Sequence, residues 1–345
     1  MNKTVCGRTI LLTGAGGSIG AALSKAILRL EPRRLVLLDH SERNLTEIDL
    51  ELSLSGWTRH TAVLGDICDS KLLVEIFRQY QPDVVYHAAA FKHVPLMENN
   101  PFAAVRNNAL GTATLARISQ GEGVAVFVMV STDKAVNPIG VMGASKRIAE
   151  LAVLRLNHGE NRMSAIRLGN VLGSQGSVVP TFLNQISRGG PVTVTHPDVS
   201  RYFFTMDQAV ESILLASGLE ERGGIFIPQL GAPVKILDIA RQLIKDARCG
   251  SGQDISITFA GLRAGDKMSE EFLYQDESTS PTGEPKLFRV TKKDVLLDTF
   301  DNHLEQLSQS VAQRSLPALI DILCQMIPDY RPTELLSAAR EGSSV

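Results

Sequence analysis

Three glycines spaced three residues apart follow the first apolar run of the chain. Gly14, Gly17 and Gly20 lie directly after the run 9–13 and before a helical pattern. In the GxxGxxG form of the dinucleotide fingerprint, the first glycine makes a tight turn, the second lets the backbone approach a pyrophosphate, and the third lets helix and strand pack closely. The free N–H groups of the helix then face the anion. The sequence therefore predicts a dinucleotide loop, with contacts from Gly14, Gly16, Gly17, Ser18, Ile19 and Gly20.

Apolar runs of strand length recur along the first half of the chain, at 9–13, 35–39, 61–64, 84–87, 124–131 and 164–168. Runs that are apolar on both faces are typical of a buried parallel sheet. Between the first two runs, the apolar residues at 19, 23, 26, 27 and 30 form the stripe of a helix that packs on the sheet. Alternating strands and helices predict an α/β fold, a doubly wound parallel sheet of Rossmann type with right-handed crossovers.

The pattern changes after residue 168, where glycine and proline become frequent and the apolar runs become short. We expect a dinucleotide-binding domain at 1–168 and a smaller α/β substrate lobe at 169–290, partly interleaved with it. A helical extension with a polar tail is expected at 291–345, with helical patterning at 304–311 and 316–327. The length of 345 residues exceeds the size at which one core stops growing, which favours such a division.

The bulk properties exclude several classes of protein. A net charge of −2 offers no basic footprint for nucleic acid and no polybasic patch for a membrane. The apolar run 124–130 is too short to span a bilayer, and the first residues lack the apolar region of a signal peptide. The four cysteines lie far apart without a CxxC pair, which favours a reduced, cytoplasmic protein.

Asp39 ends the second apolar run, 19 residues after Gly20. An acid at this position hydrogen-bonds the ribose hydroxyls of NAD and repels the 2′-phosphate of NADP. Ser41 and Arg43 follow closely and would suit that phosphate, so NADP stays the alternative. The expected cofactor is NAD.

The segment 131–147 reads S-T-D-K-A-V-N-P-I-G-V-M-G-A-S-K-R. It resembles the active-site segment of the bacterial UDP-N-acetylglucosamine 4,6-dehydratases, in the polysaccharide-biosynthesis branch of the extended short-chain dehydrogenase/reductase family. The resemblance extends through about the first 290 residues. The segments 87–95 and 108–112 resemble the family's cofactor-side loop and helix, and 167–174 and 201–205 its nucleotide-sugar loops. The segment 261–267 resembles its RPGEK-type turn, from which Ala264 and Asp266 depart.

Members of this branch often carry an N-terminal membrane region. This chain begins directly at the catalytic domain, so the resemblance implies a soluble form. A homo-oligomer, a dimer or larger, is expected because the helices after the fourth and fifth strands often pair in this family.

Ordinary members of the family use Tyr-x-x-x-Lys on a helix, where the lysine lowers the phenol pKa and binds the nicotinamide ribose. Here Met142 occupies the tyrosine position and Lys146 remains. A thioether neither takes nor gives a proton, so Met142 cannot be the base. Some members of the branch have methionine there and place the acid–base chemistry on the preceding Thr-Asp-Lys. The alternative is a regulator that binds NAD(H) without catalysing a reaction.

The resemblance therefore implies catalytic roles for Thr132, Asp133 and Lys134, just after the fifth strand. Dehydration moves a hydride from C4 of the sugar to C6, with loss of the C5 proton and the C6 hydroxyl in between. Lys134 would take the C5 proton, which requires a neutral amine with a lowered pKa. Asp133 would protonate the C6 hydroxyl, which requires a raised pKa, and Thr132 would orient or relay the C4 hydroxyl proton. A solvated ion pair at a strand end is the alternative.

The resemblance implies further contacts on both sides of the site. Those to the cofactor are Asp66, Ile67, Ala88, Ala89, Lys92, Asn108 and Lys146. Asp66 is also a candidate N-cap for the helix expected at 70–78. Those to the substrate are Lys92, His93, Asn170, Val178, Thr193, Thr195, Arg201 and Arg263, where the arginine forks suit phosphate oxygens and the extended strip 191–195 could pair with uracil. His87 and His93 have no further ligand at zinc-like spacing, so no metal site is expected.

Together these residues predict a hydro-lyase that converts UDP-N-acetylglucosamine to a UDP-4-keto-6-deoxy-N-acetylhexosamine. The alternative within enzymes is a UDP-N-acetylhexosamine 4-epimerase, which shares the first hydride step but needs no acid at C6. The presence of Asp133 favours dehydration.

Overall fold

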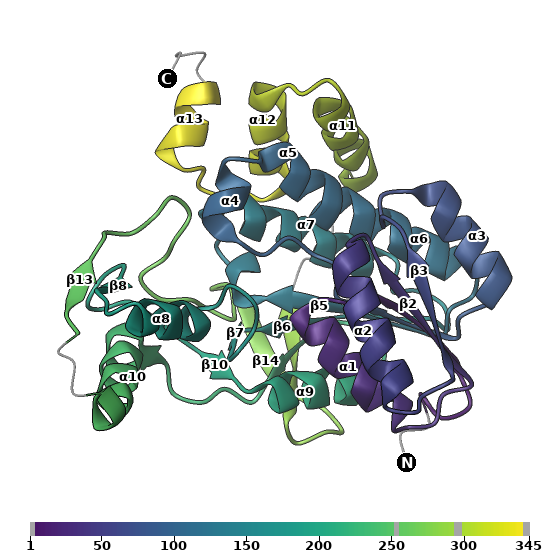
Figure 1. Ribbon diagram of the computed structural model, residues 1–345. Coiled ribbons are helices and arrows are strands. Elements are labelled where there is room, and N and C mark those ends of the chain that lie inside the picture. Colours follow the sequence, from purple (N-terminus) through teal and green to yellow (C-terminus); the bar gives the residue numbers. More distant parts are fainter. Residues whose placement is uncertain (1–3, 252–254, 293–298, 341–345) are drawn as a thin grey trace.

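A large sheet forms the centre of the molecule (Figure 1). The computed structural model describes residues 4–251, 255–292 and 299–340. Within these residues the sheet has nine strands in the order β14-β15-β11-β6-β5-β4-β1-β2-β3. Neighbours from β3 to β11 run parallel, whereas β15 pairs antiparallel with β11 and β14. The strands are β1 (Thr9–Thr13), β2 (Arg34–Asp39), β3 (His60–Leu64), β4 (Val84–His87), β5 (Val126–Thr132), β6 (Arg162–Leu168), β11 (Ile225–Pro228), β14 (Glu277–Pro281) and β15 (Leu287–Lys292).

The six strands expected from the apolar runs are all present, and their boundaries differ from the expected ones by at most two residues. The predicted α/β fold with a large parallel sheet is confirmed. The strand order reverses between β1 and β4, so the carboxyl ends of these strands border the crevice in which open α/β sheets bind ligands.

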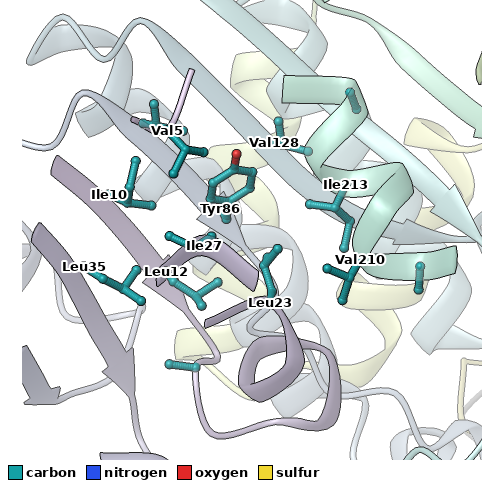
Figure 2. Close-up of a cluster of buried hydrophobic side chains, with 14 of the residues drawn as sticks. Val5, Ile10, Leu12, Leu23, Ile27, Leu35, Tyr86, Val128, Val210 and Ile213 are labelled. Carbon is teal, nitrogen blue, oxygen red and sulfur yellow. The ribbon is translucent and has the colours of Figure 1, made fainter. Parts of the chain in front are cut away.

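Helices cover both faces of the sheet, as a doubly wound fold requires. On one face α1 (Ser18–Leu28), α2 (Glu42–Leu54) and α9 (Met206–Gly218) pack against the strands. Figure 2 shows this core around Tyr86 of β4, with Ile27 of α1 and Ile213 of α9 nearby. The opposite face is covered by α3 (Ser70–Tyr80), α6 (Thr112–Gly121) and α7 (Val141–Arg155).

The Tyr86 hydroxyl shows how this core accommodates a polar atom. It is fully buried and donates a hydrogen bond of 2.7 Å to Oγ of Ser217 on α9. A buried phenol needs such a partner, so the contact fixes α9 against the middle of the sheet.

The C-terminal helices pack on the outer side of α7 (Figure 1). Helices α11 (Phe300–Ala312) and α12 (Leu316–Met326) lie where helical patterning predicted them. With α13 (Glu334–Arg340) they enclose an apolar cluster that includes α4 (Val94–Glu98), α5 (Pro101–Ala104) and the π-helical segment Val105–Gly111. The polar tail at 341–345 lies outside the described residues. None of the helices in the described ranges has the length and apolar character needed to cross a membrane.

A smaller lobe lies to one side of the sheet, with its own apolar core (Figure 1). It contains α8 (Val178–Ser187), α10 (Ile236–Ser251) and the parallel pair β8 (Val192–Val194) and β13 (Ile257–Phe259). Two short pairs connect it to the sheet: β7 (Asn170–Val171) with β10 (Phe203–Phe204), and β9 (Ser200–Arg201) with β12 (Val234–Lys235). Residues after 168 thus contribute both to this lobe and to one edge of the sheet; the division at 168 and 290 stays a prediction.

The N-terminus of α3 corrects one expectation. Asp69 caps this helix, because its side chain accepts hydrogen bonds from the backbone N–H groups of Lys71 and Leu72. Asp66, the expected cap, instead accepts from the N–H of Cys68 at 2.8 Å and pairs with Arg106. The acid nearest to the helix in the sequence makes the cap, since the N-cap side chain reaches only the first free N–H groups.

Candidate active site

The phosphate loop joins β1 to α1 with close backbone contacts. Gly14 has a φ of +67°, and a Cβ added to it would lie 2.6 Å from the backbone nitrogen of Ala89. A Cβ on Gly20 would overlap the carbonyl oxygen of Gly14. A side chain at either position would therefore push the loop away from β4 or α1. The expected roles of these two glycines, a tight turn and close packing, agree with this geometry.

Asp39 fixes the loop from the end of β2. Its buried carboxylate accepts hydrogen bonds of 2.9 Å from the N–H groups of Gly16 and Ser41. Arg43 points away and pairs with Glu47 at 2.8 Å, with most of its side chain exposed. Because Arg43 pairs with Glu47, the Asp39 carboxylate is the charged group that lies beside the loop.

A cavity opens beside this carboxylate, over the carboxyl ends of β1, β2 and β4. Several expected cofactor residues line it, whereas the sequence reasoning did not single out His40, Asn44 or Asn107. Proximity in sequence to Asp39 was the available signal for the first two. The lining residues are Gly14, Gly17, Leu38, Asp39, His40, Ser41, Asn44, Gly65, Ile67, Ala88, Ala89, Ala90 and Asn107.

Other expected cofactor residues hold the walls around this cavity. Asn108 accepts a hydrogen bond from the N–H of Phe91 and donates to its carbonyl and to Oγ of Ser145 on α7. Ser18 accepts from the N–H of Gln175, so the loop after β7 lies against the start of α1.

The expected catalytic residues form a connected group at the carboxyl end of β5. Oδ1 of Asp133 accepts a hydrogen bond of 2.9 Å from Oγ1 of Thr132 and one of 3.0 Å from Nζ of Lys134. Oδ2 of Asp133 is buried and accepts no hydrogen bond in the described part of the chain. Nζ of Lys134 also donates to Oδ1 of Asn170 at 3.2 Å. A predicted substrate residue thus touches the predicted base, and the solvated-ion-pair alternative does not fit an Asp133 side chain that is 0% exposed.

The charge state of Lys134 differs from the expectation. Burial lowers its pKa, but the negative charges of Asp133 and Glu270 outweigh burial and raise the pKa above the ordinary value of a lysine. The expected lowered pKa is therefore wrong for this arrangement, in which Lys134 carries its proton.

Lys146 behaves in the opposite way: burial lowers its pKa to about 8, against the effect of Glu150. Its amine donates to the carbonyl of Val130 at 2.8 Å, between α7 and β5.

Met142 lies one turn before Lys146 on α7 and belongs to the apolar cluster beneath the C-terminal helices. Its side chain is 2% exposed and packs in the same cluster as Val94 and Met97. Met142 is therefore a packing residue in this environment, which agrees with the fact that a thioether cannot take or give a proton.

Glu270 is a residue of this site that the sequence reasoning missed. Its buried carboxylate lies 3.6 Å from Nζ of Lys134, 3.6 Å from Nε of Arg201 and 3.9 Å from Nζ of Lys267. Arg201 directs its other donors to the carbonyls of Ser200, Lys267 and Met268. No sequence signal pointed to Glu270, because it lies 136 positions after Lys134.

A network of buried charged side chains contacts β5 and links it to α7, β6 and β14. Arg167 of β6 is fully buried and binds Glu150 of α7 and Glu277 of β14, with donor–acceptor distances of 2.6 to 3.1 Å. Ser131 of β5 donates to Glu150 as well. Arg167, which the resemblance put in a sugar-binding loop, is thus part of the internal framework.

Tyr274 connects this framework to the catalytic turn. Its hydroxyl donates a hydrogen bond of 2.8 Å to the carbonyl of Ala135, and Arg147 lies 4.8 Å from the centre of its ring. The turn Asp133–Ala135 is thereby held by a residue 139 positions further along the chain.

The remaining expected substrate residues surround the mouth of the site without forming one cluster. Nζ of Lys92 donates to Ser174 at 3.3 Å, and a Cβ added to Gly176 would meet the His93 ring. Arg263 pairs with Asp266 at 2.8 Å and is mostly exposed.

The other expected substrate residues belong to the smaller lobe. Val178 begins α8, Thr193 lies in β8, and Thr195 directly follows that strand. The backbone of this strip, 191–195, pairs with β13 along β8, and its expected pairing with uracil stays a prediction. Their contacts with substrate stay predictions.

His87 is a satisfied internal histidine. Its Nδ1 lies 2.7 Å from Oγ1 of Thr13 and its Nε2 lies 2.8 Å from Oγ1 of Thr112. Burial and the nearby Lys146 charge lower its pKa to about 3. The described residues contain no group of three or more His, Cys, Asp or Glu that could hold a metal ion.

Comparison with known proteins gives a family match over most of the chain. Residues 10–292 match the family described as "Polysaccharide biosynthesis protein". The chain is 42% identical over 320 residues to the capsular polysaccharide biosynthesis protein CapD of Staphylococcus aureus, covering 92% of this chain and 53% of that protein. It thus spans about half the length of that relative.

Two shorter relatives carry different reaction names. Over 278 residues, the chain is 31% identical to the inverting UDP-N-acetylglucosamine 4,6-dehydratase of Campylobacter jejuni, covering 79% of each. It is also 31% identical over 278 residues to the UDP-glucose 4-epimerase of Rickettsia akari, covering 78% of this chain and 79% of that protein.

Solved structures share the fold. Pen from Bacillus thuringiensis matches with a TM-score of 0.79 and 26% identity, covering 89% of this chain and 98% of that one. A dTDP-glucose 4,6-dehydratase from Streptomyces venezuelae with NAD bound matches with a TM-score of 0.67 and 21% identity, covering 87% of this chain and 98% of that one.

Proposed function

The chain belongs to the polysaccharide biosynthesis protein family, in the extended short-chain dehydrogenase/reductase branch, and from this premise we propose that it is an NAD-dependent nucleotide-sugar 4,6-dehydratase. The proposed substrate is UDP-N-acetylglucosamine, and the proposed product is a UDP-4-keto-6-deoxy-N-acetylhexosamine. A cytoplasmic location and a homo-oligomeric state remain predictions.

The observation that carries the proposal is the bonded group Thr132, Asp133 and Lys134. Elimination of water needs an acid and a base that act on neighbouring carbons, C6 and C5. Asp133 and Lys134 lie within 3.0 Å of each other at the carboxyl end of β5, where parallel sheets bind their ligands. Met142, at the position of the usual tyrosine, adds no proton chemistry of its own.

The cavity beside Asp39 fits NAD. The loop leads into the N-terminus of α1, which no side chain caps, and the N–H groups of this first helical turn would face a pyrophosphate. Asp39 offers carboxylate oxygens to a ribose and would repel a 2′-phosphate. Lys146 would hold the nicotinamide ribose. Bound NAD would supply the redox chemistry, taking a hydride from C4 of the sugar and returning it to C6.

The protons can be assigned to this chain's side chains. Thr132 passes the proton of the C4 hydroxyl to Asp133, along the hydrogen bond between Oγ1 and Oδ1. Asp133 then gives this proton to the C6 hydroxyl, which leaves as water. Lys134 takes the C5 proton and later returns it to C5, so the net loss is one water molecule.

Lys134, whose side chain is 23% exposed, must release its own proton to solvent before it can act, and it regains a proton from solvent after turnover. Asp133 is the nearest anion to its amine, and protonation of Asp133 in the first step removes that charge. Loss of a nearby opposite charge lowers the pKa of an ammonium group. The first proton transfer thus favours the neutral amine that the second step requires.

A 4-epimerase is the second candidate, because a relative with 31% identity carries that name. An epimerase shares the removal of hydride from C4 but returns it to C4 and needs no acid at C6. The carboxyl group of Asp133 beside Lys134 favours dehydration, since only dehydration needs an acid for the C6 hydroxyl.

The test is turnover of UDP-N-acetylglucosamine with NAD by the full chain and by two variants. We expect a product lighter by one water, and we expect Asp133→Asn and Lys134→Ala each to reduce kcat by about a hundredfold or more. Asp198→Asn is the matched control, because the Asp198–Lys235 pair has a similar distance of 2.9 Å but is exposed. A new isomer of unchanged mass would favour the epimerase, absence of any reaction would favour a regulator, and full activity of either site variant would refute the assignment.

A further inference from the structure

Glu270 has an environment that ordinary packing does not explain. Its side chain is 2% exposed, and Oε2 accepts no hydrogen bond from the described residues. A buried carboxylate without hydrogen bonds destabilises a fold unless nearby charges offset the lost hydration. Three cations lie within 4 Å of it: Lys134, Arg201 and Lys267. The arrangement therefore concentrates one negative charge among three positive ones beside the proposed base.

Two of these cations are anchored by the backbone. Arg201 donates to the carbonyls of Ser200, Lys267 and Met268, and Nζ of Lys267 donates to the carbonyl of Val136 at 2.7 Å. They form a fixed frame between β9, the turn after β5 and the segment before Glu270. Within this frame the Glu270 carboxylate has a defined position.

Lys134 is different, because its hydrogen bonds go to side chains of the proposed site. Its Nζ contacts Asp133 and Asn170, and it is 23% exposed. Lys134, Lys267 and Glu270 also line one small cavity at the start of α7, together with Gly140 and Gly143. Glu270 thus borders the same cavity as the proposed base, 3.6 Å from its amine.

We propose that Glu270 is a positioning residue for the dehydration, one that holds the Lys134 ammonium between two carboxylates until a substrate is bound. This inference rests on the proposed function for its catalytic meaning. Four charged groups set the electrostatics at Nζ: Asp133 from the turn after β5, Glu270, Arg201 from β9, and Lys267, which itself pairs with Glu270. Asp133 and Glu270 favour the charged amine, and Arg201 opposes them.

Removing the Glu270 charge while keeping its shape isolates this role. In Glu270→Gln, we expect the pH at which Lys134 is half-deprotonated to fall by about one unit, because one of its two neighbouring anions is gone. The direct readout is the pH dependence of Lys134 acylation by a small amine-reactive reagent, measured by peptide mass spectrometry on the full chain. The acid limb of the kcat/KM profile should move to lower pH by the same amount.

Glu271→Gln is the matched control. Glu271 is the adjacent residue with the same charge, but its carboxylate accepts from Nδ2 of Asn137 at 2.7 Å and does not contact Lys134. Its acylation profile should overlay that of the unmodified chain. Should Glu270→Gln not fold, Glu270→Asp withdraws the carboxylate by one methylene and should give a smaller shift in the same direction.

Equal acylation midpoints in the unmodified chain and Glu270→Gln would overturn the inference, even where the enzyme dehydrates its substrate. Acylation needs no turnover, so a chain without dehydratase activity would overturn the proposed function alone. A shifted midpoint in Glu271→Gln of equal size would also contradict a specific role for Glu270.

Discussion

Nζ of Lys134 lies 3.0 Å from Oδ1 of Asp133, and both atoms belong to adjacent residues at the carboxyl end of one buried strand. In the resting site this contact is an ion pair, in which the lysine is the acid and the aspartate is the base. Dehydration needs the reverse assignment. The C4 hydroxyl proton, delivered through Thr132, can convert Asp133 to the acid, and the loss of its charge then favours a neutral Lys134.

The hydrogen bond from Tyr274 to Ala135 should stabilise both the fold and the catalytic turn. We expect Tyr274→Phe to lower the free energy of unfolding by about 1 to 2 kcal/mol, because the carbonyl of Ala135 loses a buried donor. Tyr330→Phe is the matched control, since the Tyr330 hydroxyl is buried and has no hydrogen-bond partner in the described ranges. It should change stability by less than about 0.5 kcal/mol or increase it. Urea unfolding measures both, and equal losses would contradict the role given to Tyr274.

Met142 should be replaceable by another apolar side chain of similar volume. We expect Met142→Leu to keep kcat within about threefold, with a stability cost below about 1.5 kcal/mol, because position 142 packs in an apolar cluster. Steady-state kinetics and thermal unfolding provide the measurement. A hundredfold loss of kcat in a variant that folds normally would mean that the thioether takes part in the chemistry.

Burial of His87 should make the fold sensitive to acid. Its pKa is lowered to about 3 in the folded chain, against 6.5 for an unperturbed histidine. Between these two pH values the unfolded chain binds a proton that the folded chain does not, so the free energy of unfolding falls as the pH decreases from 6.5 toward 3. His87→Gln removes this contribution. Between pH 6.5 and 3, its free energy of unfolding should fall less steeply than that of the unmodified chain, with a slope smaller by about 1.4 kcal/mol per pH unit. Parallel curves for the two proteins would show that His87 does not titrate in this way.

The charge of Asp39 should determine the choice of cofactor. We expect NAD to bind at least about tenfold more tightly than NADP, a difference of about 1.4 kcal/mol, because a buried carboxylate faces the position of a 2′-phosphate. Asp39→Asn should narrow this difference. Titration calorimetry with both cofactors tests it, and equal affinities in the unmodified chain would contradict the assignment to NAD.

Much of the fold could be read from local sequence because its elements are strongly periodic. The six strands run through the core, so continuous apolar stretches mark them within two residues. The dinucleotide loop and Asp39 were visible because their positions follow from one strand–turn–helix unit. Thr132, Asp133 and Lys134 are consecutive, so a single motif contains the whole bonded group.

The residues that the sequence did not reveal act across long separations. Glu270 and Tyr274 both lie in the segment before β14, and Tyr274 is 139 positions from the Ala135 carbonyl that it contacts. This separation explains only part of the error in the pKa of Lys134, since the adjacent Asp133 raises that pKa most and the unforeseen Glu270 charge raises it further. The resemblance alone placed Arg167 in a sugar loop, whereas here two glutamates compensate its charge in the core.

The most direct test of the central claim follows a label from C4 to C6. The full chain would be incubated with NAD and UDP-N-acetylglucosamine that carries deuterium at C4, and the product analysed by mass spectrometry and NMR. Dehydration by the proposed route predicts a 4-keto product that has lost one water and carries the deuterium in the methyl group at C6. Deuterium recovered at C4 in an isomer of unchanged mass would contradict the account and identify the chain as an epimerase.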